Sequence, residues 1–280
     1  MKVIQKISLM LLVMGFLYAP DASALTVVTY FVGGNPPANA VGGGNLTDIV
    51  NAAARMWESV YSDPVTITLR YGWAPVGDAG THTLLEQGGT PNREITGIIL
   101  FDNSGAAAFF LDPTPNANEE YRRRTEEYQD LGGGFVNVAR VFSSPLGAAA
   151  GHIDLLSVAL HEIGHAMGMC AANTAFMADA KQGVLKIMED LPYAGTVIPL
   201  ATNRAGVTSH FDALQVTYGS LMSGIGADER RLPSALDVLA NAQVSGFTLA
   251  TPGSSSANLS RVTTSRGTGR VETAAPAQRK

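Results

Sequence analysis

The pentapeptide His161-Glu162-Ile163-Gly164-His165 has the residue types and the spacing of a helical metal site. Residues four apart lie on one face of a helix, so the imidazoles of His161 and His165 can reach the same metal ion. The carboxylate of Glu162 can instead hold a metal-bound water and accept its proton. The alternative, two surface histidines beside a solvated glutamate, fits poorly with the apolar residues around them. The pattern predicts a catalytic zinc site with Glu162 as general base.

A catalytic zinc ion needs a third protein ligand and keeps its fourth position open. Among the other histidines, His82 lies in a predicted Gly/Thr loop far upstream, and His152 directly precedes the predicted helix. His210 follows His165 by 45 residues and is the preferred third ligand. Asp212 remains a rival, because zinc also accepts carboxylate oxygens.

The sequence from His161 onward resembles the HExxHxxGxxH motif of the metzincin metalloproteases. Gly168 occupies the glycine position of that motif, whereas Ala171 stands where its third histidine is expected. Twelve residues after His210, Met222 lies in a Leu-Met-Ser-Gly segment that is similar to the methionine turn beneath the zinc of these enzymes. The order resembles the long-spacer branch, of which the leishmanolysins are an example, without the cysteine framework of that family.

This resemblance covers residues 154–168 and 209–246, and it implies both a fold and an activity. The fold is an α+β metzincin-like catalytic domain with a twisted, mostly parallel sheet, an active-site helix and a small, mainly helical C-terminal subdomain. The activity is that of a secreted zinc-dependent endopeptidase acting on protein or peptide substrates. One catalytic zinc ion is expected at His161, His165 and His210, and calcium is not indicated.

Two other functions are compatible with the motif. In a thermolysin-like zinc peptidase the third ligand is a glutamate on a later helix, and Glu189 is the best candidate, although Pro192 follows it closely. A non-catalytic secreted binding protein could keep zinc for folding alone, but such a site needs no Glu162. Cys170 would close the fourth zinc position as a ligand, so we interpret it as a buried small hydrophobic residue.

The metal ligands require a helix, and the surrounding sequence predicts one with Asp154 as N-cap and Gly168 at its C-terminal end. Segments rich in β-branched residues predict strands at residues 25–32, 65–71, 94–101 and 135–142. Further helices are predicted from residue 45 or 47 to 61 and at 234–243. The charged segment 115–130 is interpreted as a solvated helix with i, i+4 ion pairs.

Two features could act on a substrate near the predicted site. The strand at residues 94–101 is expected at a sheet edge, where it could align a peptide as an added strand. Arg230 and Arg231 could favour acidic substrates, although exposed arginines are the simpler interpretation. No tyrosine directly follows Met222 to stabilise an oxyanion, so that role falls to the metal or to another group.

Composition limits the class of protein. The 280 residues are 46% hydrophobic with a net charge of −5, which indicates a sizeable core and argues against a nucleic-acid partner. The single cysteine excludes an intrachain disulfide framework. Lys2 and Lys6 precede an apolar run and a small-residue Ala-Ser-Ala site, so residues 1–24 are predicted to be a signal peptide.

The domain organisation follows from these signals. Residues 25–168 should form an N-terminal catalytic subdomain with the HExxH helix, and residues 169–250 a C-terminal subdomain with the third ligand and the Met-turn. Residues 251–280, rich in Ser, Thr, Gly and Arg, are predicted to be a disordered tail. The mature protein is expected to be secreted or periplasmic, with no membrane span after signal cleavage.

Overall fold

A four-stranded sheet forms one side of the molecule in a computed structural model that describes residues 24–250 and 270–274. Its strands lie in the order β1-β2-β4-β3, with β1, β2 and β4 parallel and β3 antiparallel to β4. The bounds are β1 (Thr26–Phe31), β2 (Thr66–Ala74), β3 (Gly80–Gly88) and β4 (Arg93–Asp102). The predicted strands at 25–32, 65–71 and 94–101 are confirmed, and this sheet is mostly parallel as expected.

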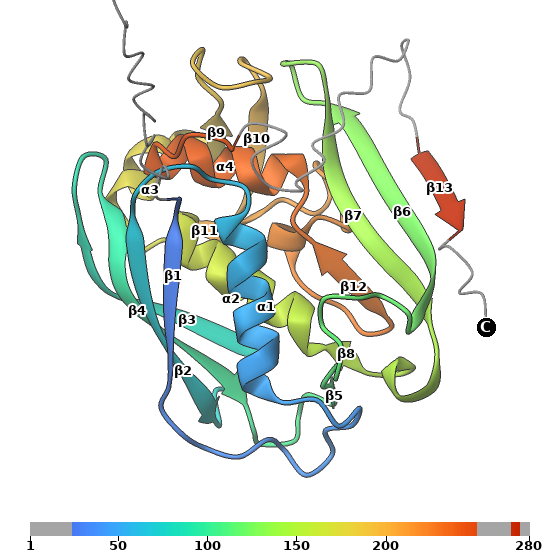
Figure 1. Cartoon of the computed structure of the whole chain (residues 1–280). Helices are drawn as coiled ribbons and strands as arrows, with labels where there is room; N and C mark the ends of the chain where they lie inside the picture. The colour runs from blue at the N-terminus through green and yellow to red at the C-terminus, as the bar shows by residue number, and fades with distance from the viewer. Residues whose placement is uncertain (1–23, 251–269, 275–280) are drawn as a thin grey trace, which may run out of the picture.

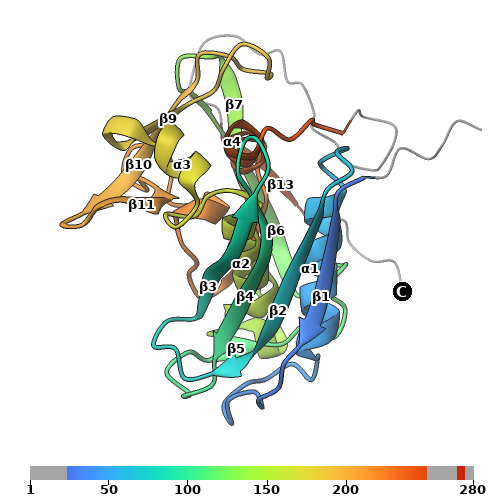
Figure 2. The same ribbon diagram turned by 90° about the vertical axis from the view of Figure 1, so that its left-hand side faces the viewer.

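Two helices, α1 (Leu46–Glu58) and α2 (Leu155–Met167), cover one face of this sheet, as Figures 1 and 2 show. Asn45 caps α1 by accepting a hydrogen bond from the Asp48 amide at 2.9 Å. The indole of Trp57 on α1 is fully buried and donates to the Leu160 carbonyl of α2 at 3.0 Å. The helices are therefore joined along the segment that carries the predicted metal ligands.

A second sheet, in the order β12-β7-β6-β13, is antiparallel throughout. Its strands are β6 (Tyr121–Asp130), β7 (Phe135–Pro145), β12 (Glu229–Leu232) and β13 (Arg270–Ala274). The strand predicted at 135–142 is confirmed as β7. The solvated helix predicted at 115–130 is wrong, because most of this segment is β6.

The charges of β6 pair as they do on a strand rather than on a helix. Arg124 bonds to Glu126, and the Tyr128 hydroxyl donates to the same carboxylate at 2.9 Å. Side chains two apart share a face only in an extended chain. Tyr121 and Thr125 are buried on the opposite-facing positions of the strand. The ion pair between Arg124 and Glu126 is therefore an i, i+2 pair rather than the i, i+4 pair of a helix.

The chain after α2 contains both helices and strands. Residues 169–250 contain two α-helices and four strands, so the expectation of a mainly helical C-terminal subdomain is wrong. A small antiparallel sheet has the order β11-β10-β9. The elements are α3 (Thr174–Asp179), β9 (Val184–Lys186), β10 (Val197–Asn203), β11 (Gly206–Phe211), β12 and α4 (Ala235–Ser245). Helix α4 confirms the closing helix, and Ser234 caps it in a capping box with Asp237.

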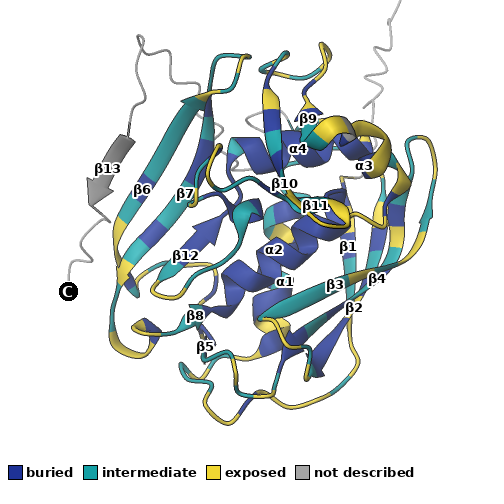
Figure 3. Ribbon diagram, turned by 180° about the vertical axis from the view of Figure 1, so that it is seen from behind, coloured by how far each residue is buried: buried dark blue, intermediate teal, exposed yellow. Residues whose placement is uncertain are grey.

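Short elements complete the described part of the chain. Strand β5 (Phe109–Phe110) pairs in parallel with β8 (Ile153–Asp154), directly before α2. Single 3₁₀ turns are η1 (Gly147–Ala149), η2 (Lys181–Gly183) and η3 (Leu221–Ser223). Every residue of α2 is buried, as the dark blue helix in Figure 3 shows, because α1, both larger sheets and α4 surround it. The helix that carries the predicted metal ligands thus lies at the centre of the hydrophobic core.

Two sequence predictions concern segments that lie wholly or partly outside the residues that the structure describes. The predicted signal peptide lies outside the described residues except for Ala24. The predicted disordered tail contains β13, and the rest of it, 251–269 and 275–280, also lies outside the described residues. No helix among the described residues is long and apolar enough to cross a membrane.

Candidate metal centre

Both ends of α2 are fixed as the sequence predicts. At the N-terminus, the carboxylate of Asp154 accepts hydrogen bonds from the Ser157 amide at 3.0 Å and the Ser157 hydroxyl at 2.7 Å. At the C-terminus, Gly168 has a positive φ of 154°, and a Cβ there would lie 2.7 Å from the Ser245 hydroxyl oxygen. The glycine therefore allows α2 to end where α4 packs against it.

The imidazoles of His161, His165 and His210 converge at one point. His161 Nε2 lies 3.1 Å from the Nε2 atoms of both His165 and His210, and the ligand atoms of the three residues lie within 4.8 Å of one another. His210 comes from β11, which lies beside α2 (Figure 3). Within the described residues, neither Asp212 nor Glu189 belongs to this group.

Hydrogen bonds fix the orientation of two of the rings. His161 Nδ1 lies 2.8 Å from the Leu221 carbonyl, and His165 Nδ1 lies 2.6 Å from the Met169 carbonyl. A carbonyl oxygen only accepts, so each Nδ1 carries the proton and donates it. Each Nε2 therefore keeps its lone pair and directs it toward the common point, as in histidine metal ligands.

The electrostatic surroundings keep these histidines neutral. Burial, reinforced by His210, lowers the pKa of His161 to about 3. Burial and the neighbouring imidazoles lower the pKa of His165 well below its ordinary value, and burial lowers that of His210. Neutral imidazole is the form that binds a metal ion. The three-histidine cluster could therefore hold a metal at neutral pH without first losing protons.

Glu162 borders the same site and differs from an exposed carboxylate. It is 5% exposed, and burial raises the pKa of its carboxyl group to about 7, while His82 lowers it and Asp78 raises it. A Cβ at Gly80 would lie 3.0 Å from Glu162 Oε1, so the glycine leaves room for the carboxylate. A carboxyl group with a pKa near neutrality can both accept and release a proton.

A cavity of about 300 Å³ opens in front of the cluster. The start of β3 lines the cavity together with Glu162, His210 of β11 and Ile225 after η3. The expectation that residues 94–101 form the edge strand is wrong, because β4 is paired on both sides and β3 is the edge. The strand order depends on long-range pairing, which the local alternation of residues cannot indicate.

Met222, the residue predicted to form a Met-turn, packs against α2. Its side chain is fully buried, and a Cβ at Gly164 would lie 2.6 Å from the Met222 sulfur. The Met222 amide donates to Asp237 Oδ1 of α4 at 3.1 Å. The preceding Leu221 carbonyl receives the His161 hydrogen bond. The turn thus supports the middle of the HExxH segment and one of its imidazoles.

No match emerges from any of the comparisons with known proteins. Neither family models, nor curated proteins, nor solved structures match this chain. The residues of the site and their geometry are therefore what supports any function.

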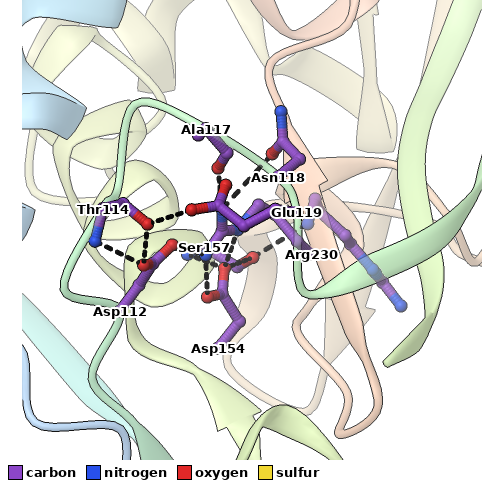
Figure 4. Close-up of polar contacts among 9 residues, drawn as sticks. Asp112, Thr114, Ala117, Asn118, Glu119, Asp154, Ser157 and Arg230 are labelled. Carbon is purple, nitrogen blue, oxygen red and sulfur yellow. Dashed lines mark hydrogen bonds and ion pairs between the residues drawn. The ribbon is translucent and has the colours of Figure 1, made fainter. Parts of the chain in front are cut away.

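Arg230 and Arg231 have structural roles that the sequence does not reveal. Arg230 is fully buried and bonds to Asp154 at 2.8 and 3.0 Å and to Asp112, so it joins β12 to the N-cap of α2 (Figure 4). Arg231 is also fully buried and donates to the carbonyls of Ser220 and Gly224 on either side of η3. Neither arginine is exposed or lines the cavity, so a preference for acidic substrates through them is not supported.

The environment of His82 differs from the one predicted from the sequence. This residue belongs to strand β3 rather than to a loop, and its side chain is 1% exposed and bonds to Glu94 Oε1 at 2.8 Å. The β-branched neighbours Thr81 and Thr83 were the available strand signal. His82 lines the cavity beside the metal cluster.

Proposed function

We propose that the protein is a zinc-dependent endopeptidase. The observation that carries the proposal is the convergence of three neutral Nε2 atoms beside a buried glutamate in an open cavity. Three histidine ligands and one free position are typical of catalytic rather than structural zinc sites. The presence of Glu162 next to the cluster favours catalysis over a purely structural metal, because a structural site needs no general base.

The donor set fits zinc in chemistry and in spacing. Zinc binds imidazole nitrogens at about 2.0–2.1 Å in tetrahedral geometry, which corresponds to nitrogens a little over ~3 Å apart. The Nε2 separations of 3.1 Å agree with this spacing. When bound, zinc supplies Lewis acidity that polarises a carbonyl and acidifies water.

Residues of the chain itself would provide the general base and the strand that binds the substrate. Glu162 takes the proton of the attacking water and later delivers it to the leaving amine, for which its raised pKa is suitable. Strand β3 is an edge of its sheet and lines the cavity, so an extended peptide can bind there as an added strand.

The arrangement also supports a metzincin-like relationship. Gly168 ends the ligand helix, His210 completes the cluster from a distant strand, and Met222 lies beneath it. Glu189 is exposed and lies outside the cluster, which disfavours the thermolysin-like alternative. Secretion is part of the proposal and rests on the sequence of residues 1–24.

Glu162→Gln tests the proposal directly. We expect the variant to bind zinc as the wild type does but to lose at least about 100-fold of its casein hydrolysis, as expected for loss of a general base. Burial of the ionised carboxylate is unfavourable, so the substitution should not lower the unfolding temperature. Glu189→Gln, on an exposed residue, is the matched control and should keep full activity. Zinc-dependent hydrolysis that persists in Glu162→Gln would contradict the proposed role.

A further inference from the structure

Helix α4 supplies the group that holds the backbone next to His165. His165 Nδ1 donates to the Met169 carbonyl at 2.6 Å, which keeps its Nε2 free for a metal. The Met169 amide donates in turn to Asn241 Oδ1 of α4 at 3.0 Å. Two hydrogen bonds that share Met169 therefore connect α4 to a proposed metal ligand.

The Met169 segment lies outside helices and strands and needs such an anchor. Helix α2 ends at Met167, and Gly168 has a positive φ of 154°. The Cys170 amide donates to the Gly168 carbonyl at 2.7 Å, which closes a turn of three residues centred on Met169. A turn this short makes one internal hydrogen bond, so the orientation of its central amide and carbonyl depends on partners elsewhere. For the Met169 amide that partner is Asn241.

The Asn241 side chain is completely buried, and its orientation is fixed. While Oδ1 accepts from Met169, Nδ2 donates to the Asp237 carbonyl one turn earlier in α4 at 3.2 Å. A buried amide group is costly unless its polar atoms have partners, and here both atoms do. A Cβ at Gly168 would lie 3.3 Å from Oδ1, so the glycine also permits this close approach. Asn241 is therefore held with its acceptor toward Met169.

The same face of α4 supports the other histidine of the ligand helix. Asp237 precedes Asn241 by four residues, so the two side chains lie on one face of α4. Asp237 Oδ1 accepts from the Met222 amide at 3.1 Å. The carbonyl of the same peptide unit belongs to Leu221 and accepts from His161 at 2.8 Å. Two residues of one helix thus anchor both backbone segments that orient the ligands of α2.

We propose that Asn241 is a positioning residue of the metal centre: it holds the Met169 carbonyl where that carbonyl keeps the His165 proton on Nδ1. Neutral imidazole can carry its proton on either nitrogen, and the hydrogen bond at one nitrogen decides which. Without Asn241 the Met169 amide is buried without a partner, so the turn shifts to find one and the carbonyl moves with it. The proposal rests on the proposed function, because the free Nε2 of His165 matters only where a metal binds.

The first test uses the metal-free protein and detects the His165 proton directly. Long-range proton–nitrogen correlation spectra distinguish an imidazole protonated on Nδ1 from one protonated on Nε2. We expect His165 to carry its proton on Nδ1 alone in the wild type and to show both forms in Asn241→Leu, while His161 stays unchanged. Ser245→Ala is the matched control, because it removes a buried hydrogen bond of 2.6 Å from α4 to the Met167 carbonyl and leaves the bond between Asn241 and Met169 in place.

An unchanged Nδ1 proton on His165 in a folded Asn241→Leu variant would overturn the proposal, and so would the same mixture of forms in Ser245→Ala. If Asn241→Leu does not fold, Asn241→Ser applies the same test. The shorter serine hydroxyl can bond the Asp237 carbonyl four residues earlier but does not extend to Met169. His165 with its proton on Nδ1 alone in Asn241→Ser would overturn the proposal equally.

A second readout is zinc affinity, measured by competition with a chromophoric chelator. Loss of an outer partner of a metal ligand costs about 10–100-fold in affinity, so Asn241→Leu should bind zinc at least about 10-fold more weakly than the wild type, and Ser245→Ala within about twofold of it. Equal affinities of the two variants would contradict the positioning role. Absence of zinc binding by the wild type would instead refute the proposed function, and the proton position in the metal-free protein would still test the role of Asn241.

Discussion

At the scale of single residues, burial shifts the pKa of the glutamate and the pKa values of the histidines of the site in opposite directions. It lowers the pKa values of His161 and His165 and raises that of Glu162, because a charged form is disfavoured away from water. In the proposed site, burial therefore keeps the histidines neutral, as metal ligands must be, and leaves the glutamate able to accept and release a proton. The same cavity holds His82, whose neighbours outweigh burial and favour its cation.

The lowered histidine pKa values predict that acid destabilises the metal-free protein. The ordinary histidine pKa is 6.5, and His161 reaches about 3 in the folded state. As pH falls below 6.5, the unfolded chain binds protons that the folded chain does not. The contribution of each such histidine to the free energy of unfolding is therefore fully present above pH 6.5. It is lost progressively toward pH 3, by up to about 1.4 kcal/mol per pH unit for each such site.

Denaturant titrations of the metal-free protein across this pH window measure the effect. The variant His161→Gln should show a shallower pH dependence than the wild type, since one of the titrating sites is gone. Replacing His152, which is not in the cluster, should leave the slope unchanged. Equal slopes for His161→Gln and wild type would contradict the assigned role of burial.

At the scale of elements, α2 is held in place by β12 and η3 rather than by its sequence alone. The adjacent side chains Arg230 and Arg231 fix the start of the ligand helix and the turn that contains Met222, respectively. Strand alternation places consecutive side chains on opposite faces, so two neighbouring residues can serve two separate elements. The Arg230 side chain therefore joins the second sheet to the N-terminal end of α2 (Figure 4).

Arg230→Met should be strongly destabilising. The substitution keeps an apolar stem but leaves the carboxylates of Asp112 and Asp154 buried without their cation. Removing one partner of a buried ion pair in this way lowers the free energy of unfolding by about 3–5 kcal/mol. Chemical denaturation should report a loss of that size, while Arg122→Met, on an exposed position of β6, should change the free energy of unfolding by less than about 0.5 kcal/mol. Similar effects of the two substitutions would contradict the structural role of Arg230.

At the scale of the whole molecule, local patterns predicted the ligand helix and the first-sheet strands but not their arrangement. The i, i+4 spacing of His161 and His165 and the cap at Asp154 are local, and the structure has them as expected. His210 was inferred from the need for a third ligand and from the resemblance, because its partners lie 45 or more residues away in the chain and no local spacing links them. The edge position of β3 depends on strand order, which no single segment determines.

The burial of charged residues was the other property hidden from the sequence. Arg230 and Arg231 look like ordinary surface residues until Asp112, Asp154 and the carbonyls around η3 are brought to them by the fold. His82 likewise acquires its environment from Glu94 on the neighbouring strand. Tertiary partners decide whether a charge can be buried, and spacing along the chain does not report them.

The metal content of the purified protein, wild type beside His210→Ala, is the most direct measurement of whether three histidines form one zinc site. Elemental analysis should find one zinc per chain in the wild type and in the control His152→Ala, and a loss of at least most of it in His210→Ala. Zinc retained in His210→Ala would show that another residue is the third ligand. Absence of zinc from the wild type would contradict the proposed zinc enzyme.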